Sequence, residues 1–198
     1  QSIDTSEAER SEGVYRVVTG RDYPILFAAA GFYDQSPLAV DKVRHGGEPV
    51  AAVVADTLDH ANKALPKIRV VYEPLPVLLD PAEAAGNKDV LIHERLGEYR
   101  HPGSHFPEPG TNIFHHYRLR KGDIEAGFKE ADVSVEGEFE FSLSAHSALE
   151  PHGAICRWQG KDRVEIWAST QAPFALQQTV AEMFGLPHAH VRVHVLYL

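Results

Sequence analysis

The chain has 198 residues, of which 43% are hydrophobic and 24% charged, an ordinary balance for a soluble globular protein with one large or two small domains. Its formal net charge of −9 argues against a nucleic-acid partner or an anionic membrane surface, because either would require a basic face. The sequence contains no run of about 18 apolar residues, so no membrane span is expected.

Cys156 is the single cysteine, and its apolar neighbours predict a buried position in a strand. One thiol cannot form an internal disulfide, which agrees with a reducing compartment and hence with a cytoplasmic location. An iron–sulfur cluster takes four thiolates, so this chain cannot hold one. Both ends of the sequence are abrupt, with no starting methionine and no polar tail, and we expect a truncated or split subunit.

The first part of the chain mixes strands with one helix. Residues 14–18 are β-rich, and the nearly continuous apolar run 49–55 predicts a strand covered on both faces. A helix is expected over residues 58–65, capped by residue 56 or 57. A further strand at 68–72 completes the order strand, helix, strand, which predicts a βαβ-like unit.

Proline and glycine punctuate residues 81–120, and a segment of this length without regular elements is typical of a connection between domains. Order returns at residue 121, where Asp123 caps a short helix that ends near Ala131. Apolar and polar residues then alternate over 133–143, with glutamates on the polar side, which predicts a long, half-buried strand.

The last part of the chain predicts two strands joined by a turn, then a helix, then a closing strand. The strands are expected at 153–158 and 163–168. Pro173 suits the first turn of the helix, and Gly185 ends it as a left-handed cap. Residues 190–198 are expected to form the closing strand.

Twelve histidines raise the alternative of a zinc site. His188, His190 and His194 have the spacing of side chains on one side of a strand, whereas the adjacent His115 and His116 would face opposite sides. No His-Glu-x-x-His motif or Cys/His knuckle accompanies them, so hydrogen-bonded or exposed histidines are the better interpretation.

The polar run at 169–173, Ser-Thr-Gln-Ala-Pro, lies where a predicted strand ends and a predicted helix begins. The N–H groups of a helix N-terminus favour an anion or an oxo group, and the Gln171 amide can donate a hydrogen bond there without adding charge. The alternative is that Thr170 or Gln171 only caps the helix. Glu150 leaves a similar choice, between a catalytic role and a turn held by backbone N–H groups.

Several blocks of the sequence resemble, in order, the large subunit of the xanthine dehydrogenase/aldehyde oxidase family of molybdenum hydroxylases. The blocks are 3–9, 13–22, 41–55, 68–77, 119–123, 130–133, 146–152, 169–173 and 184–187. The resemblance implies an α+β fold class. It makes residues 1–80 an a/b hammerhead domain, 81–120 an extended linker, and 121–198 the incomplete start of a molybdopterin-binding domain.

The resemblance also implies a role for Gln171, whose counterpart in the family approaches an oxygen ligand on molybdenum. Gln171 is thus the expected cofactor-binding residue, with no catalytic residue and no metal ligand in this chain. The family's Gly-rich loop with Phe and its glutamate base are expected beyond Leu198. This chain would then form one wall of the cofactor site and be inactive alone.

In the complete enzyme, the resemblance implies hydroxylation of N-heterocycles or aldehydes with water as the oxygen source. It implies a molybdopterin cofactor, with iron–sulfur clusters and in many relatives FAD on partner chains or domains. The implied partners are the remaining molybdopterin-domain polypeptide, the iron–sulfur and flavin subunits, and further copies of the holoenzyme. The alternative is a non-catalytic hammerhead module that docks partner subunits. The substrate cannot be read from these residues.

Overall fold

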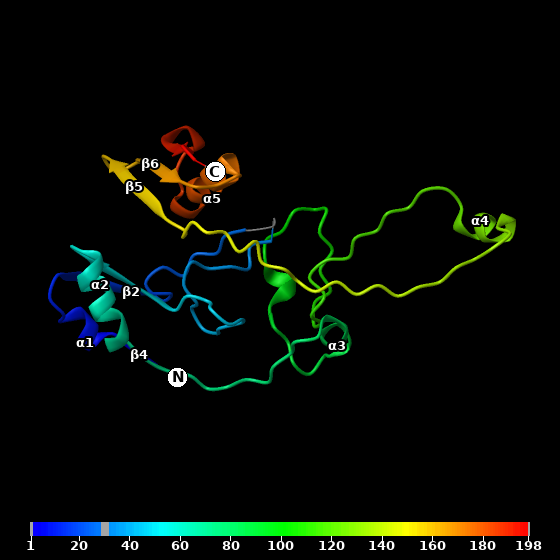
Figure 1. Ribbon diagram of the computed structural model, residues 1–198, viewed down its shortest axis with the longest axis horizontal. Coiled ribbons are helices and arrows are strands. Elements are labelled where there is room, and N and C mark those ends of the chain that lie inside the picture. Colours follow the sequence, from blue (N-terminus) through cyan, green and yellow to red (C-terminus); the bar gives the residue numbers. More distant parts are fainter. Residues whose placement is uncertain (1, 29–31, 198) are drawn as a thin grey trace.

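The computed structural model describes residues 2–28 and 32–197. Two small antiparallel sheets and two helices form the first segment of the chain, which we take up to residue 80 (Figure 1). Their core consists of Ala8, Val17 and Ala64. The elements in chain order are β1 (Ser2–Asp4), α1 (Ser6–Glu9), β2 (Val14–Thr19), β3 (Ala51–Ala55), α2 (Leu58–Ala64), a 3₁₀ turn (Leu65–Lys67) and β4 (Arg69–Val71).

The expected helix and its cap are confirmed, since the Thr57 side chain accepts a hydrogen bond from the N–H of His60. The predicted βαβ-like unit is wrong. β3 pairs antiparallel with β2, and β4 pairs antiparallel with β1, because strands from the start of the chain supply the partners. The expectation that 49–55 is covered on both faces is also wrong, because exposure alternates along β3 and Val54 is 47% exposed.

The connecting segment, residues 81–120, contains the short helix α3 (Pro81–Gly86) and a 3₁₀ turn (Leu96–Glu98). It is not a free linker, because Leu96 and Tyr99 pack with Phe32 in a small buried cluster. The amide of Asn112 adds order by donating to the carbonyls of Ala84 and Val90. The segment is therefore fastened to the first segment by packing as well as by the chain.

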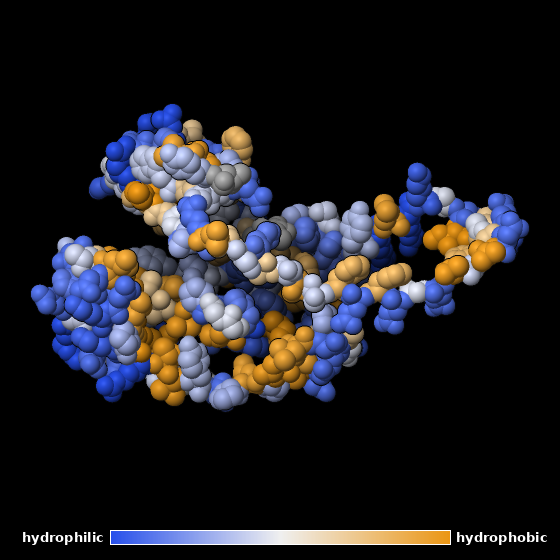
Figure 2. Space-filling view, viewed as in Figure 1, coloured by the Kyte–Doolittle hydropathy of each residue, from blue (hydrophilic) through white to orange (hydrophobic). Residues whose placement is uncertain are grey.

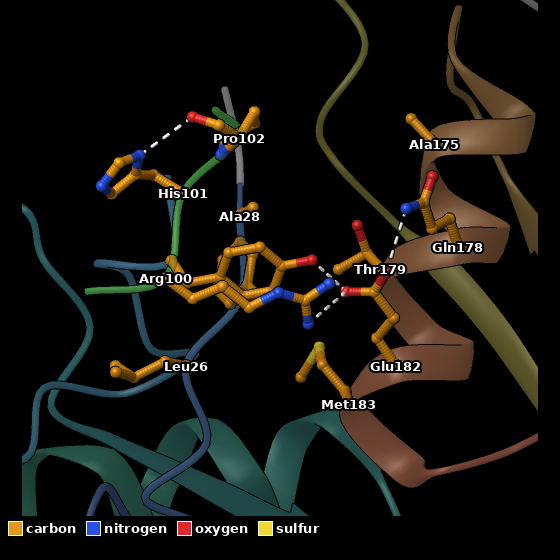
Figure 3. Close-up of a pocket in the computed structure, with 12 residues that line it drawn as sticks. Leu26, Ala28, Arg100, His101, Pro102, Ala175, Gln178, Thr179, Glu182 and Met183 are labelled. Atoms are coloured by element: carbon orange, nitrogen blue, oxygen red, sulfur yellow. Dashed lines mark hydrogen bonds and ion pairs between the residues drawn. The ribbon is translucent and has the colours of Figure 1, made fainter. Parts of the chain in front are cut away.

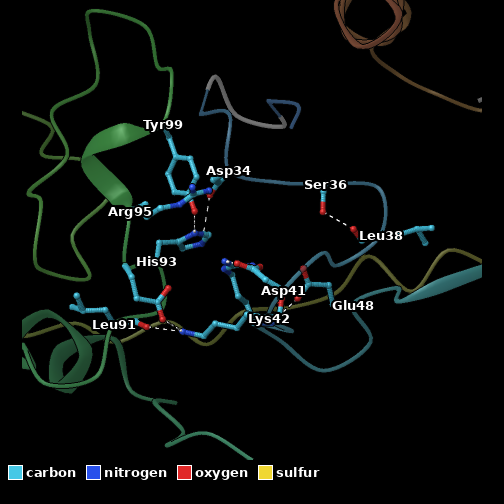
Figure 4. A network of polar contacts seen from close by, with 12 residues as sticks. Asp34, Ser36, Leu38, Asp41, Lys42, Glu48, Leu91, His93, Arg95 and Tyr99 are labelled. Carbon is cyan, nitrogen blue, oxygen red and sulfur yellow. Dashed lines mark hydrogen bonds and ion pairs between the residues drawn. The ribbon is translucent and has the colours of Figure 1, made fainter. Parts of the chain in front are cut away.

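Polar contacts reinforce this attachment (Figure 4). Lys42 donates to the Leu91 carbonyl at 2.8 Å and to the Glu94 carboxylate at 2.6 Å. His93 lies with its Nε2 atom 3.7 Å from Asp34. Burial lowers the pKa of His93, and the neighbouring Arg44 lowers it further. The ring therefore stays neutral at pH values at which a free histidine gains a proton.

A long arm leaves the rest of the molecule and returns (Figure 1). Near its tip lies α4 (Ile124–Glu130), whose N-cap Asp123 accepts a hydrogen bond from Ala126, as predicted. The strand expected over 133–143 is not formed, because no strand in the described chain pairs with it. Its apolar side chains are exposed, Val135 by 93% and Phe141 by 89%, and hydrophobic side chains line the arm in Figure 2.

A sheet–helix unit, residues 154–194, completes the described structure. β5 pairs antiparallel with β6, and β6 pairs parallel with β7, with α5 connecting the parallel strands. Its buried core is made by Val164, Ile166, Ala181 and Val191. The elements are β5 (Ala154–Gln159), β6 (Arg163–Ala168), α5 (Pro173–Phe184), a 3₁₀ turn (His188–His190) and β7 (Val191–His194).

The ends of α5 are as expected, with Pro173 in its first turn and Gly185 in the left-handed conformation at φ 63°. The closing strand is shorter than expected, and Leu198 lies outside the described residues. The predicted burial of Cys156 is wrong, because the thiol is exposed. Its strand, β5, lies at the edge of the sheet and is exposed along its whole length.

Replacing Ile166 by alanine tests the core of the sheet–helix unit. Ile166 is 4% exposed, and removing its buried methyl and methylene groups is expected to lower the free energy of unfolding by about 2–4 kcal/mol. Ile155 is the matched control, because it is 69% exposed on β5, and Ile155→Ala is expected to cost less than about 1 kcal/mol. Urea denaturation followed by tryptophan fluorescence measures both, and equal losses would contradict this core.

Replacing His93 by phenylalanine tests the buried network through its pH dependence. The folded-state pKa of His93 lies below its usual 6.5, so the unfolded chain takes up the proton first. Stability from this residue is present above pH 6.5 and is lost as pH falls below it. His93→Phe should therefore flatten the stability profile below pH 6.5 in urea titrations. Parallel profiles for wild type and His93→Phe would contradict the assignment.

Candidate functional site

The junction between β6 and α5 is the candidate site. Ser169 donates from its hydroxyl to the Glu150 carboxylate at 3.1 Å, and the backbone N–H of Ala172 donates to Thr170 Oγ1, also at 3.1 Å. Gln171 between them is exposed. Within the described residues its amide forms no hydrogen bond, so the proposed capping role of Gln171 is wrong. Thr170 instead stabilises the turn that precedes the helix.

Backbone donors lie next to this amide. The first hydrogen bond within α5 runs from the N–H of Leu176 to the carbonyl of Ala172 at 3.0 Å, and Pro173 has no N–H. The N–H groups of Phe174 and Ala175 therefore have no acceptor among the described residues. Together with the helix dipole they favour an electron-rich ligand. The junction offers hydrogen-bond donors without a formal positive charge.

Glu150 lies beside the junction through its bond to Ser169. The expected bond from turn N–H groups to this carboxylate is absent from the described structure, so that alternative is wrong. The carboxylate is exposed. Its hydrogen bond with Ser169 ties the residues before β5 to the end of β6, next to Gln171.

The histidines do not converge on a metal. His190 lies 3.2 Å from an Asp162 oxygen, and His194 lies 3.8 Å from Glu165 and stacks on Trp167. His115 and His116 lie outside any strand. No group of three or more histidine, cysteine, aspartate or glutamate side chains fit to hold a metal ion occurs among residues 2–28 and 32–197.

A cavity of about 360 Å³ opens along one face of α5 (Figure 3). Tyr33 from the first segment and Arg100 from the connecting segment meet Glu182 of the helix there. Sequence reasoning missed this cluster, because nothing local marks residues 149 positions apart as partners. The lining residues are Leu26, Phe27, Ala28, Tyr33, Arg100, His101, Pro102, Ala175, Gln178, Thr179, Glu182 and Met183.

Two family models match the chain in succession. Residues 1–76 match the a/b hammerhead domain of aldehyde oxidase and xanthine dehydrogenase, and residues 105–198 match the molybdopterin cofactor-binding domain. Both matches agree with the α+β fold described above. No helix among the described residues has the length and hydropathy needed to cross a membrane.

Known proteins resemble the chain over nearly its full length. Xanthine dehydrogenase/oxidase of Rattus norvegicus is 32% identical over 98% of this chain, and aldehyde oxidase 2 of Cavia porcellus is 32% identical over 98%. The structure of CO dehydrogenase from Oligotropha carboxidovorans superposes with a TM-score of 0.77 and 29% identity over 98% of this chain. The chain spans 13% of each of the two relatives and 25% of the CO dehydrogenase chain.

These matches are ordered, cover both halves of the sequence, and agree between sequence and structure. The chain belongs to the xanthine dehydrogenase and aldehyde oxidase family of molybdenum hydroxylases, and it corresponds to a part of their length.

Replacing Thr170 by valine tests the turn before α5. Valine keeps the shape but cannot accept the N–H of Ala172, and losing this hydrogen bond is expected to cost about 1 kcal/mol of unfolding free energy. Thr179→Val in the middle of the helix is the control, expected to change stability by less than about 0.5 kcal/mol. Urea denaturation measures both variants. A neutral Thr170→Val would show that the hydroxyl does not support the turn.

Proposed function

We propose that this chain supplies one wall of the molybdopterin cofactor site in a molybdenum hydroxylase, and that Gln171 is the residue that faces the cofactor. The observation that supports the proposal most directly is the exposed, unpaired amide at the start of α5, within the stretch that matches the molybdopterin cofactor-binding domain. Further support comes from relatives named as xanthine dehydrogenase and aldehyde oxidase.

The residues of the junction fit the cofactor by their chemistry. An oxo group or a phosphate needs hydrogen-bond donors, and the junction has the Gln171 amide together with two free backbone N–H groups. A neutral amide donates a hydrogen bond without adding a formal charge, whereas a lysine or arginine would add a full positive charge. Ser169 and Thr170 hold the flanking backbone, so the donor is carried on a fixed turn.

When bound, the molybdopterin cofactor supplies the redox chemistry of the hydroxylation. The contribution of this chain is to position and orient the cofactor. Gln171 would donate its amide N–H to the cofactor, and α5 would present the positive end of its dipole to the same region. Glu150 accepts a hydrogen bond from the Ser169 hydroxyl, which ties the residues before β5 to the end of β6.

The chain would act within a larger assembly. The expected partners are the remaining molybdopterin-domain polypeptide and the iron–sulfur and flavin components, in a cytoplasmic enzyme that associates further. Exposed apolar residues at 133–143 support a need for further polypeptide, because such a surface is seldom left in contact with water. N-heterocycles or aldehydes are the proposed substrates of the complete enzyme, and the chain by itself is proposed to be inactive.

A non-catalytic assembly module remains the second candidate. The hammerhead match over residues 1–76 favours docking of other polypeptides. The long arm with its exposed apolar residues at 133–143 favours it as well. The two candidates differ in whether the β6–α5 junction contributes to turnover.

Replacing Gln171 by alanine in the complete enzyme tests the proposal. Loss of a hydrogen bond made to the reacting centre is expected to lower kcat by roughly 10- to 100-fold, with full cofactor loading in the metal analysis. Gln159→Ala, an exposed glutamine of β5, is the control and should leave kcat unchanged. Dye reduction with xanthine and with an aldehyde measures both variants. An unchanged kcat for Gln171→Ala would refute the role of this residue.

Reconstitution separates the enzyme from the module. This chain, the remaining subunit polypeptide and the cofactor are combined, and substrate-dependent dye reduction is expected only when all three are present. Activity without this chain would show that the chain does not form part of the cofactor site.

A further inference from the structure

One face of α5 points away from its own sheet and toward the first and connecting segments (Figure 3). The residues on this face recur at helical spacing and end with Glu182 and Met183 near the C-terminus of the helix. On the opposite face Ala181 is buried against β6 and β7. The helix is therefore packed on its sheet by one side and held by polar contacts on the other.

Glu182 is the point at which three parts of the chain meet. The Tyr33 hydroxyl donates to Oε2 of Glu182, and an Arg100 nitrogen lies 3.9 Å from the same oxygen. The Gln178 amide donates to Oε1 at 2.9 Å. Both carboxylate oxygens thus have partners, from the first segment, from the connecting segment and from α5 itself.

Tyr33 and Arg100 also contact each other directly, independently of the helix. The backbone N–H of Tyr33 donates to the Arg100 carbonyl at 3.0 Å. The Arg100 guanidinium lies 4.4 Å from the centre of the Tyr33 ring, a cation–π arrangement. Together they present one hydroxyl and one positive charge to a single carboxylate.

The protonation states support this arrangement. The Tyr33 hydrogen bond, followed by that of Gln178, lowers the pKa of Glu182, with smaller contributions from Arg100 and His188. The same hydrogen bond raises the pKa of Tyr33. Near neutral pH the carboxylate is ionised and the phenol protonated, the combination that gives a strong charge-assisted hydrogen bond.

We propose that Glu182 is a positioning residue, a joint that fixes the sheet–helix unit, and with it the Gln171 junction, on the first and connecting segments. Its consequence for turnover rests on the function proposed above, whereas the joint itself does not. Because α5 is packed on β6 and β7, a change of tilt at Glu182 moves the whole unit as one body.

A small tilt of α5 about Glu182 produces a larger displacement at Gln171, because the two residues lie near opposite ends of the helix. At about 1.5 Å per residue, Glu182 lies roughly 14 Å along the axis from the start of α5. A tilt of about 5° displaces that start by about 1 Å, an error that can cost an enzyme up to about 100-fold in rate. The joint therefore acts on the junction without touching the cofactor.

The joint can be tested on the 198-residue chain by a distance measurement. One spin label is placed on the exposed thiol of Cys156 in the sheet–helix unit, and the other on Asn62→Cys, an exposed position of α2. Pulsed electron paramagnetic resonance should give one narrow distance distribution at pH 7.5. Glu182→Gln, which removes the charge, and Tyr33→Phe, which removes one hydroxyl, should each at least double its width.

Glu7→Gln is the matched control, because Glu7 pairs with Arg69 inside the first segment, and it should leave the distribution unchanged. Lowering the pH until Glu182 takes up a proton should broaden the wild-type distribution and leave that of Glu182→Gln unaffected. Unchanged widths in Glu182→Gln and Tyr33→Phe, with circular dichroism showing folded chains, would overturn the joint.

In the complete enzyme, Tyr33→Phe should lower kcat by roughly 3- to 10-fold with little change in KM. The two proposals fail separately. A large effect of Gln171→Ala with no broadening in the distance measurement overturns the joint and leaves the function standing. Broadening together with a neutral Gln171→Ala keeps the joint and overturns the role of Gln171 at the cofactor.

Discussion

Parallel pairing of β6 with β7 is the constraint on which the candidate site depends. Parallel neighbours cannot be joined by a tight turn, so the chain must cross over the sheet, and α5 is that crossover. Burial of Ile166, Ala181 and Val191 holds the helix on the strands. The residues between β6 and α5 are thereby left at the carboxyl end of a strand and the amino end of a helix, where backbone donors are free.

The same crossover explains how the Glu182 carboxylate can influence the distant Gln171 junction. A helix packed on its sheet transmits tilt rather than absorbing it, because close-packed interfaces do not deform continuously. Glu182 lies near one end of α5, and Gln171 lies two residues before the other end. The first segment contacts that unit through Tyr33, and the connecting segment contacts it through Arg100.

The sequence predicts the helix caps correctly. Thr57, Asp123 and Gly185 cap their helices as expected, because capping depends on residues a few positions apart. Pairing was misread, since the partner of β3 lies over 30 residues earlier in β2. The burial of Cys156 was misjudged because an apolar strand can lie at a sheet edge. The Tyr33–Glu182 contact has no local signal in the sequence, and the role proposed for Gln171 rests on the family resemblance.

The exposed arm has a consequence for the behaviour of the chain in solution. A stretch with β-branched and aromatic side chains on alternate positions and unpaired backbone groups is a template on which identical chains can stack. Glu136, Glu138 and Glu140 occupy the intervening positions and act as gatekeepers, because like charges brought into register repel one another. Their negative charge therefore disfavours stacking of this stretch in register.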